Sequence, residues 1–359
     1  MSSKDTVKSV LDWPAFDMAA SEKQKKLLGE MQRLTEMHMI ACPPYQSVIN
    51  KLYAPIENMD SLQDVPFIPV RLFKHQRLSS VPERDIIKTM TSSGTSGHKP
   101  SQIFLDKITA ALQVKVLVKI VSSFLGSKRL PMLVIDCKAT VADRKRFSAR
   151  TAGILGFSIF SHNVEYALDE DMSLNEDRIK EFLSKHEGQD ILLFGFTFII
   201  WQNFLQELER RQLNLPLERG TLIHGGGWKK LVNEAVDNDE FKDRISKATG
   251  IQKVHNYYGM VEQTGSIFME CEEGYLHAPA WADILIRDPI DFKPLPIGEK
   301  GLVQLLSVIP HSYPGHCILS EDVGFIVGID DCDCHRKGTY FKIEGRLEQA
   351  EVRGCSDSY

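Results

Sequence analysis

Apolar residues recur with two different periods along the chain, and the change of period separates regions of different secondary structure. In residues 1–50, Leu27, Met31, Leu34 and Met37 follow the three- and four-residue spacing of one helix face. Further along, apolar runs bounded by turn residues predict strands, and the segments between them predict helices over 198–212 and 228–248. The expected strands are 132–136, 191–195, 221–224 and 254–258.

Strands that alternate with helices predict a mostly parallel sheet with flanking helices, that is, an α/β fold. After Gly265 helical periodicity nearly disappears, and apolar runs at 284–286, 302–308, 325–329 and 340–343 are separated by Pro, Gly and Asp. This pattern favours an antiparallel or barrel-like part. We divide the chain into four segments: a helical cap at 1–50, an α/β core at 51–265, an antiparallel subdomain at 266–345 and a mobile tail at 346–359.

Composition narrows the class of protein. The 359 residues are 43% hydrophobic and 25% charged, with net charge −5, which is typical of a globular protein and not of a nucleic-acid binder. The longest apolar run that we identify, 191–201, is too short for a bilayer, and the polar N-terminus lacks a signal sequence, so we expect no membrane span and a cytoplasmic location. An odd count of seven cysteines argues against a disulfide framework and leaves thiols as metal ligands or nucleophiles.

Two segments carry candidate chemistry. Residues 91–99 combine five hydroxyl side chains with two glycines, which suits a loop that donates to phosphate, although a flexible Ser/Gly linker has the same composition. Residues 257–263 place aromatic rings, a glycine and Glu262 just past an expected strand end, where ligands bind in open α/β sheets. Glu262 could hold Mg²⁺ and a ring could lie against a nucleobase; a core aromatic followed by a solvated Glu is the alternative.

Together with Asp322 before Gly324 and with Gly345-Arg346, these segments resemble the adenylate-forming superfamily of acyl-CoA synthetases, firefly-type luciferases and peptide-synthetase adenylation domains. Within it, the chain is most similar to the acyl-protein synthetases of bacterial luciferase operons. The matching segments are Phe73-Lys74, Thr91–Lys99 with Ile103–Asp106, Ser148–Arg150, Phe194–Thr197, His224–Lys229, Tyr258–Gln263, Ser312–Gly315 and Arg353–Asp357.

The resemblance implies that a fatty or related acid reacts with ATP to give acyl-adenylate and pyrophosphate, and that the acyl group then moves to a cysteine of the enzyme. By the same resemblance, Mg²⁺ is held by Glu262, the ribose by Asp322, and the adenine by Gly225, Gly226 and Tyr258. Gly227, Gly259 and Gln263 complete the nucleotide site. The phosphates are held by the loop residues Thr91, Ser92, Ser93, Gly94, Thr95, Ser96, Gly97 and Lys99.

Two departures from the superfamily matter. Val261 stands where a threonine usually contacts the α-phosphate, so we expect Gln263 or Thr264 to supply that donor. The sequence ends soon after the hinge residue Arg346, so we expect no small C-terminal domain and place the catalytic lysine at Lys74 or Lys99. In the tail that replaces the domain, Cys355 is the expected acyl acceptor, with Arg353 favouring its thiolate.

A last group of residues is Cys332 and Cys334 with Cys271 and His277, which are ligand types for a closed tetrahedral zinc site. Unligated buried thiols are the alternative. We expect Cys42, Cys137 and Cys317 to pack in the core or in loops, and Phe194, Phe196, Phe198 and Trp201 to pack in the core more than to line an acyl pocket.

Three functions remain open at this stage: an acyl-protein synthetase that passes its acyl group to a reductase or carrier protein, a phenylacetate-type CoA or carrier ligase in which Cys355 is idle, and a non-catalytic nucleotide-binding subunit. Whether label from an acid becomes bound to the protein or to CoA separates the first two.

Overall fold

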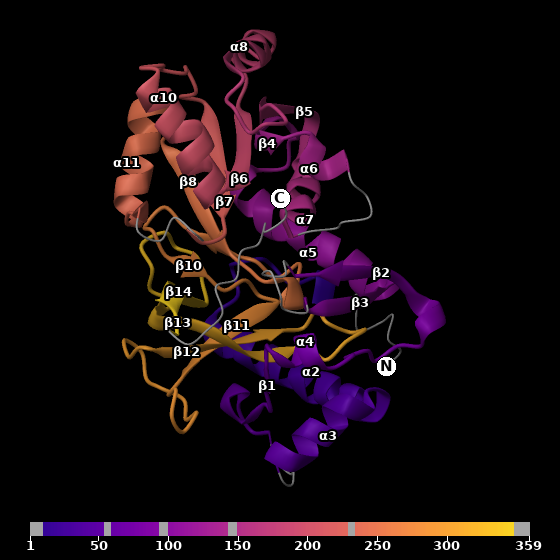
Figure 1. Cartoon of the computed structure of the whole chain (residues 1–359). Helices are drawn as coiled ribbons and strands as arrows, with labels where there is room; N and C mark the ends of the chain where they lie inside the picture. Colours follow the sequence, from indigo (N-terminus) through magenta and orange to yellow (C-terminus); the bar gives the residue numbers. More distant parts are fainter. Residues whose placement is uncertain (1–9, 54–58, 93–99, 143–148, 229–233, 348–359) are drawn as a thin grey trace. The chain divides into compact units, whose positions relative to one another are not determined.

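A computed structural model describes residues 10–53, 59–92, 100–142, 149–228 and 234–347 (Figure 1). The described residues form two compact units. Unit 1 contains 10–123 and 259–347, and unit 2 contains 124–258. An α/β fold with parallel and antiparallel sheet is confirmed, and each unit is described by itself below.

Unit 2 is built on a parallel sheet whose strand order is β5-β4-β6-β7-β8. Its central strands are buried along nearly their whole length and are mostly apolar, because helices cover both faces. The strands are β4 (Leu130–Cys137), β5 (Ser161–Leu168), β6 (Ile191–Phe196), β7 (Gly220–Gly225) and β8 (Lys253–Tyr258). The four strands expected in this region are confirmed, and β5 is an addition.

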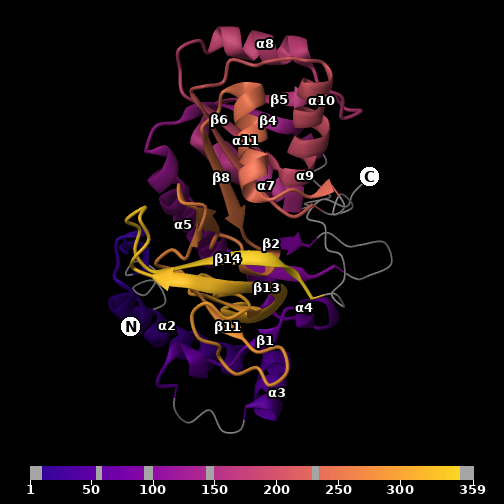
Figure 2. The same cartoon turned by 90° about the vertical axis from the view of Figure 1, so that its left-hand side faces the viewer.

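The helices of unit 2 connect these strands. Helices α10 and α11 lie side by side (Figures 1 and 2), and Arg244 of α11 pairs with Glu209 of α10 at 2.5 Å. The helices are α6 (Ala139–Ala142), α7 (Ala149–Phe157), the 3-10 turn η3 (Ser158–Phe160), α8 (Glu176–Lys185), α9 (Thr197–Ile199), the π-helical segment η4 (Ile200–Leu205), α10 (Gln206–Arg210) and α11 (Asn238–Thr249).

The helix expected over 228–248 is wrong in its first half among the described residues. Trp228 is not helical, and α11 begins at Asn238 because Asp237 caps it, its side chain accepting a hydrogen bond from Glu240 N at 2.8 Å.

Unit 1 contains the expected antiparallel part, in the strand order β11-β12-β13-β14-β10-β9. Figure 2 shows β13 and β14 as a long pair, with β1 joining β13 in parallel. The strands are β1 (Ile68–Pro69), β9 (Phe268–Glu270), β10 (Leu276–His277), β11 (Ala282–Arg287), β12 (Gly301–Ser307), β13 (Cys317–Ile329) and β14 (Thr339–Arg346). A separate antiparallel pair, β2 (Ile86–Thr91) and β3 (Gln102–Asp106), was not expected from the sequence.

The expected N-terminal helices are present, and Lys23 anchors the first of them to the sheet with a buried ion pair to Asp283 and a hydrogen bond to Ala278 O. The helical elements of unit 1 are α2 (Ala20–Ala41), α3 (Pro43–Leu52), α4 (Leu72–His75), α5 (Lys107–Leu125, whose last two residues fall in unit 2), and the 3-10 turns η1 (Leu62–Asp64), η2 (Glu83–Asp85) and η6 (Val261–Gln263).

Helix α5 is long and apolar enough to cross a membrane by length and composition, a feature that the sequence analysis overlooked. In this fold it packs against protein. Thr109 Oγ1 accepts a hydrogen bond from Ser312 N, and Lys119 Nζ donates to Trp13 O. The core helix of a soluble protein passes the same length and composition test, so α5 is weak evidence for a membrane span.

Candidate active site

In unit 2 the expected nucleotide-site residues lie at the carboxyl ends of adjacent parallel strands. Gly225 ends β7 and pairs in register with Tyr257 of β8, one residue before Tyr258. A Cβ on Gly225 would lie 2.5 Å from the Tyr257 ring, so only glycine lets that ring approach the strand. Gly226 has φ +81°, which turns the chain out of the sheet. Gly225, Gly226 and Tyr258 are thus brought together at the sheet edge where ligands bind.

A buried histidine, His224, helps to hold the carboxyl ends of β6 and β7 together. His224 Nδ1 lies 3.0 Å from Thr197 Oγ1, and that hydroxyl also lies 3.2 Å from Gly225 O. Burial lowers the pKa of His224 to about 3, with smaller contributions from Lys242 and His255, so the ring is neutral. A neutral ring that donates from Nδ1 lets the Thr197 hydroxyl donate to the carbonyl. This arrangement ties the end of β6 to the end of β7.

In unit 1 the expected magnesium ligand is buried. Glu262 lies in η6 with 2% of its surface exposed, and its Oε1 has no hydrogen-bond partner among the described residues. The backbone here is tightly packed, since a Cβ on Gly315 would lie 2.7 Å from Glu262 O. An unpartnered buried carboxylate oxygen is costly unless a ligand satisfies it. Mg²⁺ prefers such oxygens, so the carboxylate fits the ion.

The two donors considered for the α-phosphate are both engaged in this structure. Gln263 Nε2 donates to Gly315 O at 2.8 Å and to Leu305 O at 3.2 Å, and the residue is buried. Thr264 Oγ1 donates to Val261 O at 2.8 Å. The Gln263 amide therefore holds η6 against β12 and the turn before β13, and Thr264 is the more accessible of the two.

Asp322, the expected ribose-binding residue, interacts directly with Arg346, the expected hinge residue. Asp322 of β13 pairs in register with Arg346 of β14, and Arg346 Nε donates to Asp322 Oδ1 at 2.8 Å. The neighbouring Glu321 forms an ion pair with Arg71, the residue that precedes α4. That helix carries the buried Lys74, so one catalytic-lysine candidate is tied to the same end of β13.

The loop at 91–99 is described only at its base. Ser92 N donates to Ser101 O at 3.2 Å, and Ser101 N donates to Ser92 Oγ at 2.9 Å, which extends the β2–β3 pairing past Thr91. Residues 93–99, with Lys99, lie outside the described residues, as do Lys229 and the tail that contains Arg353 and Cys355.

The four expected zinc ligands lie together in unit 1. Their ligand atoms, one each from Cys271, His277, Cys332 and Cys334, are all within 4.8 Å of one another. Cys271 Sγ and Cys332 Sγ are 3.9 Å apart, and Cys334 Sγ lies 3.3 Å from His277 Nε2. Zinc at about 2.3 Å from each sulfur separates two thiolates by roughly 3.8 Å, so the cluster matches a tetrahedral site. The other described cysteines, Cys42, Cys137 and Cys317, are buried as expected.

The protein environment keeps two of these side chains, Cys271 and His277, uncharged. Burial raises the pKa of the Cys271 thiol to about 12, and burial lowers the pKa of His277 to about 4, with Arg336 adding to the effect. A bound metal ion replaces the thiol proton, so occupancy would convert a neutral apolar cluster into a set of ligands.

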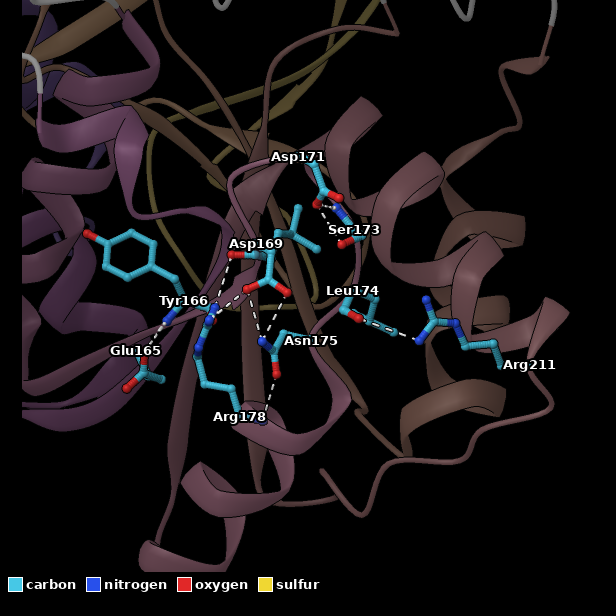
Figure 3. Close-up of polar contacts among 10 residues, drawn as sticks. Glu165, Tyr166, Asp169, Asp171, Ser173, Leu174, Asn175, Arg178 and Arg211 are labelled. Carbon is cyan, nitrogen blue, oxygen red and sulfur yellow. Dashed lines mark hydrogen bonds and ion pairs between the residues drawn. The ribbon is translucent and has the colours of Figure 1, made fainter.

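A dense polar network in unit 2 contrasts with the sites above (Figure 3). Asp169 accepts from Asn175 Nδ2 and from Arg178 Nη2 at 2.7 Å, while Asn175 Oδ1 caps α8 by accepting from Arg178 N. Apart from Arg211, the labelled residues lie in β5, in α8 or in the segment that joins them. These hydrogen bonds hold the connection between the end of β5 and the start of α8.

Sequence reasoning missed two polar residues beside Glu262. Gln113 and Tyr313 are 6% and 0% exposed. Burial and the negative charge of Glu262 raise the pKa of the Tyr313 phenol, and a hydrogen bond from the Gln113 side chain lowers it. The sequence could have drawn attention to Gln113, because it is the one amide side chain in the apolar sequence of α5. Tyr313 lay within a matching segment but received no role.

A family model described as "Acyl-protein synthetase, LuxE" matches residues 1–359. The chain is 25% identical over 315 residues to the long-chain-fatty-acid–luciferin-component ligase of Aliivibrio fischeri, covering 84% of this chain and 79% of that protein. The Vibrio harveyi protein of the same name is 26% identical over 317 residues, covering 84% and 78%.

Among solved structures, an open conformation of 2-hydroxyisobutyryl-CoA ligase, in complex with 2-HIB-AMP and CoA, superposes with TM-score 0.71. It is 17% identical and covers 93% of this chain and 72% of that one, so the likeness concerns the fold. The same ligase in a postadenylation state gives TM-score 0.70. The adenylate-forming fold and the sequence resemblance are thereby confirmed, and the chain belongs to the acyl-protein synthetase family of ligases.

Proposed function

We propose that this enzyme activates a long-chain fatty acid with ATP and then captures the acyl group on Cys355. In the first step a carboxylate oxygen attacks the α-phosphorus, the bond to the β-phosphate bridging oxygen breaks, and pyrophosphate leaves. In the second, the thiolate attacks the acyl carbon and AMP leaves. The names of the relatives, long-chain-fatty-acid ligases, support the substrate class.

The observation that carries the adenylation step is the buried Glu262 carboxylate with an unpartnered oxygen, placed directly after the Tyr258-Gly259 turn. Negative charge builds on phosphoryl oxygens as the carboxylate attacks, so positioned donors and a cation provide most of the catalysis. When bound, Mg²⁺ supplies the positive charge that stabilises the phosphoryl oxygens, and Glu262 is the residue that holds the ion.

The remaining roles follow the positions of the side chains. Asp322 accepts hydrogen bonds from the ribose, and Arg346, whose Nε donates to Asp322 Oδ1, orients that carboxylate. The ends of β7 and β8 receive the adenine through Gly225, Gly226, Gly227, Tyr258 and Gly259. The hydroxyl loop at 91–99 takes the phosphates, and Lys74 or Lys99 neutralises the attacking carboxylate.

Adenylation is tested by screening carboxylic acids in an ATP–pyrophosphate exchange assay. Acids of graded chain length are offered with ATP and labelled pyrophosphate, and exchange of label into ATP is measured. We expect a maximum for long-chain acids. Failure to exchange pyrophosphate into ATP with any of the acids would favour a non-catalytic nucleotide-binding subunit. Labelled acid that appears on added CoA, with none on the protein, would favour a CoA ligase.

We propose that the acyl-protein passes its acyl group to a partner reductase or carrier protein in the cytoplasm, and that the four segments defined by sequence serve as cap, core, subdomain and acyl-carrying tail. Mixing acyl-labelled enzyme with the candidate partner and following label to that partner tests this transfer.

We further propose that Cys271, His277, Cys332 and Cys334 bind a structural zinc ion. Four protein ligands leave no position for water or substrate, so the ion stabilises the antiparallel sheet. Metal analysis of protein purified without chelator should give one zinc per chain. A preparation that is folded, reduced and free of zinc would contradict the proposal.

A further inference from the structure

The backbone that leaves β7 in unit 2 passes from buried to exposed within one residue. Gly225, the last residue of the strand, is buried, whereas Gly226 and Gly227 are exposed. Gly226 turns the chain with φ +81°, and a Cβ there would lie 3.1 Å from the Phe196 ring of β6. The direction of this turn depends on the peptide group that joins Gly225 to Gly226.

A side chain at the end of the neighbouring strand holds that peptide group. Thr197 directly follows β6 and is 5% exposed, and its Oγ1 donates to Gly225 O at 3.2 Å. A trans peptide group is planar, so a fixed Gly225 carbonyl also fixes the direction in which the Gly226 N–H points. The hydroxyl therefore orients a backbone donor at the place where the chain becomes exposed.

A buried histidine in turn fixes the direction of the Thr197 hydroxyl. His224 Nδ1 lies 3.0 Å from Thr197 Oγ1. Because the hydroxyl hydrogen is used toward Gly225 O, the hydroxyl oxygen accepts from the ring, and His224 carries its proton on Nδ1. The ring is 2% exposed and packs against Phe241 with centroids 4.6 Å apart. Two consecutive hydrogen bonds thus run from the imidazole to the backbone of the turn.

These two hydrogen bonds are not needed to pair the strands. The ladder already joins β6 to β7 from Ile191 and Gly220 to Phe196 and Gly225. The side chains add their contacts at the last of these pairs, at the sheet edge where ligands bind in open α/β folds. A backbone donor whose direction is fixed beforehand loses little freedom when a ligand binds, which favours affinity.

We propose that Thr197 and His224 are positioning residues that set the affinity of the enzyme for ATP by holding the Gly225–Gly226 peptide group in its binding orientation. The inference rests on the proposed function, because it requires this sheet edge to receive the adenine of ATP. Both side chains are buried and act through the backbone, so they govern binding of the nucleotide and leave the chemical step unchanged.

The first test measures ATP binding without turnover. Equilibrium dialysis of the full chain against labelled Mg·ATP, with no acid present, gives the dissociation constant. Thr197→Val keeps the branched shape of the side chain and removes the hydroxyl. One hydrogen bond makes a small net contribution, so we expect the affinity to fall about 3- to 10-fold. Thr197→Ser keeps the hydroxyl and should bind ATP nearly as tightly as the wild type.

Two variants of His224 test the second hydrogen bond. The asparagine amide in His224→Asn can donate from the place of Nδ1, whereas leucine in His224→Leu has no donor. We expect His224→Leu to weaken ATP binding about 3- to 10-fold and His224→Asn to recover most of that loss.

Pyrophosphate exchange with a long-chain acid separates nucleotide binding from catalysis. In Thr197→Val and His224→Leu the KM for ATP should rise with the dissociation constant. The maximal rate and the KM for pyrophosphate should stay at the wild-type values, because the proposed phosphate-binding residues lie elsewhere in the chain.

Thr249→Val is the matched control, since it also removes a buried hydroxyl of unit 2 that donates to a backbone carbonyl, that of Ile245 at 2.6 Å. Thr249 ends α11 and precedes β8, so it lies at the amino ends of the strands. Its ATP affinity should equal that of the wild type even where its unfolding temperature falls. Thermal unfolding of each variant without nucleotide shows that it is folded.

The outcomes separate this inference from the proposed function. If the wild-type protein binds ATP but exchanges no pyrophosphate with any acid, the proposed function is wrong and the dialysis comparison still decides the inference. Wild-type protein that binds no ATP would overturn both. The inference alone is overturned if Thr197→Val and His224→Leu lower only the unfolding temperature, or if Thr197→Ser binds ATP as weakly as Thr197→Val.

Discussion

At the scale of single residues, the account depends on carboxylates that are held in place by a few close contacts. Asp322 is oriented by Arg346, and the backbone of Glu262 is packed closely against Gly315. The sequence motifs identified both carboxylates. They did not identify Gln113 or Tyr313, because a lone amide or phenol acquires meaning only from neighbours that are distant in sequence.

Glu262→Ala is expected to reduce acid-dependent ATP–pyrophosphate exchange about a thousandfold or more, because a transition-state metal contact is worth several kcal/mol. Asp322→Ala should also abolish exchange by removing the ribose anchor. Steady-state exchange rates measured over a range of Mg²⁺ and ATP concentrations check both. Exchange near the wild-type rate in the Glu262 variant would contradict the magnesium assignment.

Gly265→Ala should destabilise unit 1 more than Gly298→Ala. Both glycines have positive φ, +96° and +88°, so each alanine costs about 1–2 kcal/mol in backbone strain. Only at Gly265 would the new Cβ meet backbone, 2.7 Å from Gln113 Cα, whereas nothing lies within 4 Å at Gly298. That clash adds about 1–3 kcal/mol. Equal urea midpoints for the two variants would show that α5 does not press against Gly265.

At the scale of elements, two long strands connect the proposed zinc ligands with Asp322, the proposed ribose-binding residue. The β13–β14 pair runs from Ile329 and Thr339, near Cys332 and Cys334, to Asp322 and Arg346. A metal that holds the turn between these strands to β9 and β10 therefore stabilises the ladder that carries Asp322. We expect a zinc ion bound by this cluster to be structural, because the cluster lies at the opposite end of the β13–β14 pair from Asp322.

Cys334→Ser should lose zinc and unfold at a lower temperature. Zinc contributes folding free energy directly, and a loss of about 3 kcal/mol would lower the midpoint by roughly 6–12 °C in a unit of this size. Cys42→Ser is the control, as its buried thiol lies outside the cluster. Well below its midpoint, Cys334→Ser should keep its exchange rate. A normal midpoint with lost exchange would assign the cysteine to the chemistry.

Sequence patterns were most informative for fully buried strands. The runs that became β4, β6 and β7 are mostly apolar, because helices cover both faces of a parallel sheet. Strand β2 alternates between partly exposed and exposed residues until Met90, and β5 begins with polar residues, so neither presented an apolar run. The start of α11 depended on one capping aspartate in a polar stretch that has the composition of a helix.

At the scale of the whole molecule, buried neutral histidines make stability depend on pH. His316 and His38 stack at 4.9 Å between α2 and the turn before β13, and His311 lies in that turn. Burial lowers the pKa of His316 to about 3 and that of His311 to about 4, and the charge of Arg33 lowers both further. Burial and the neighbouring His316 lower the pKa of His38 well below its usual value.

These histidines stay neutral when folded and bind protons near pH 6.5 when unfolded. Stability should therefore be complete above pH 6.5 and fall as the pH drops from 6.5 towards 4, by roughly 1.4 kcal/mol per pH unit for each histidine. Urea midpoints between pH 8 and 5 check the slope. A midpoint that stays constant down to pH 5 would contradict the burial of neutral imidazoles.

The central claim is that adenylation and acyl capture use different residues of one chain, and the direct measurement is labelling of Cys355→Ser protein. Wild-type and variant enzyme are incubated with labelled long-chain fatty acid and Mg·ATP, and protein-bound label released by hydroxylamine is counted beside ATP–pyrophosphate exchange. Serine is a poor nucleophile without a paired base. The account predicts nearly normal exchange with no thioester-bound label in the variant. Label that remains thioester-linked to the Cys355→Ser protein would contradict it.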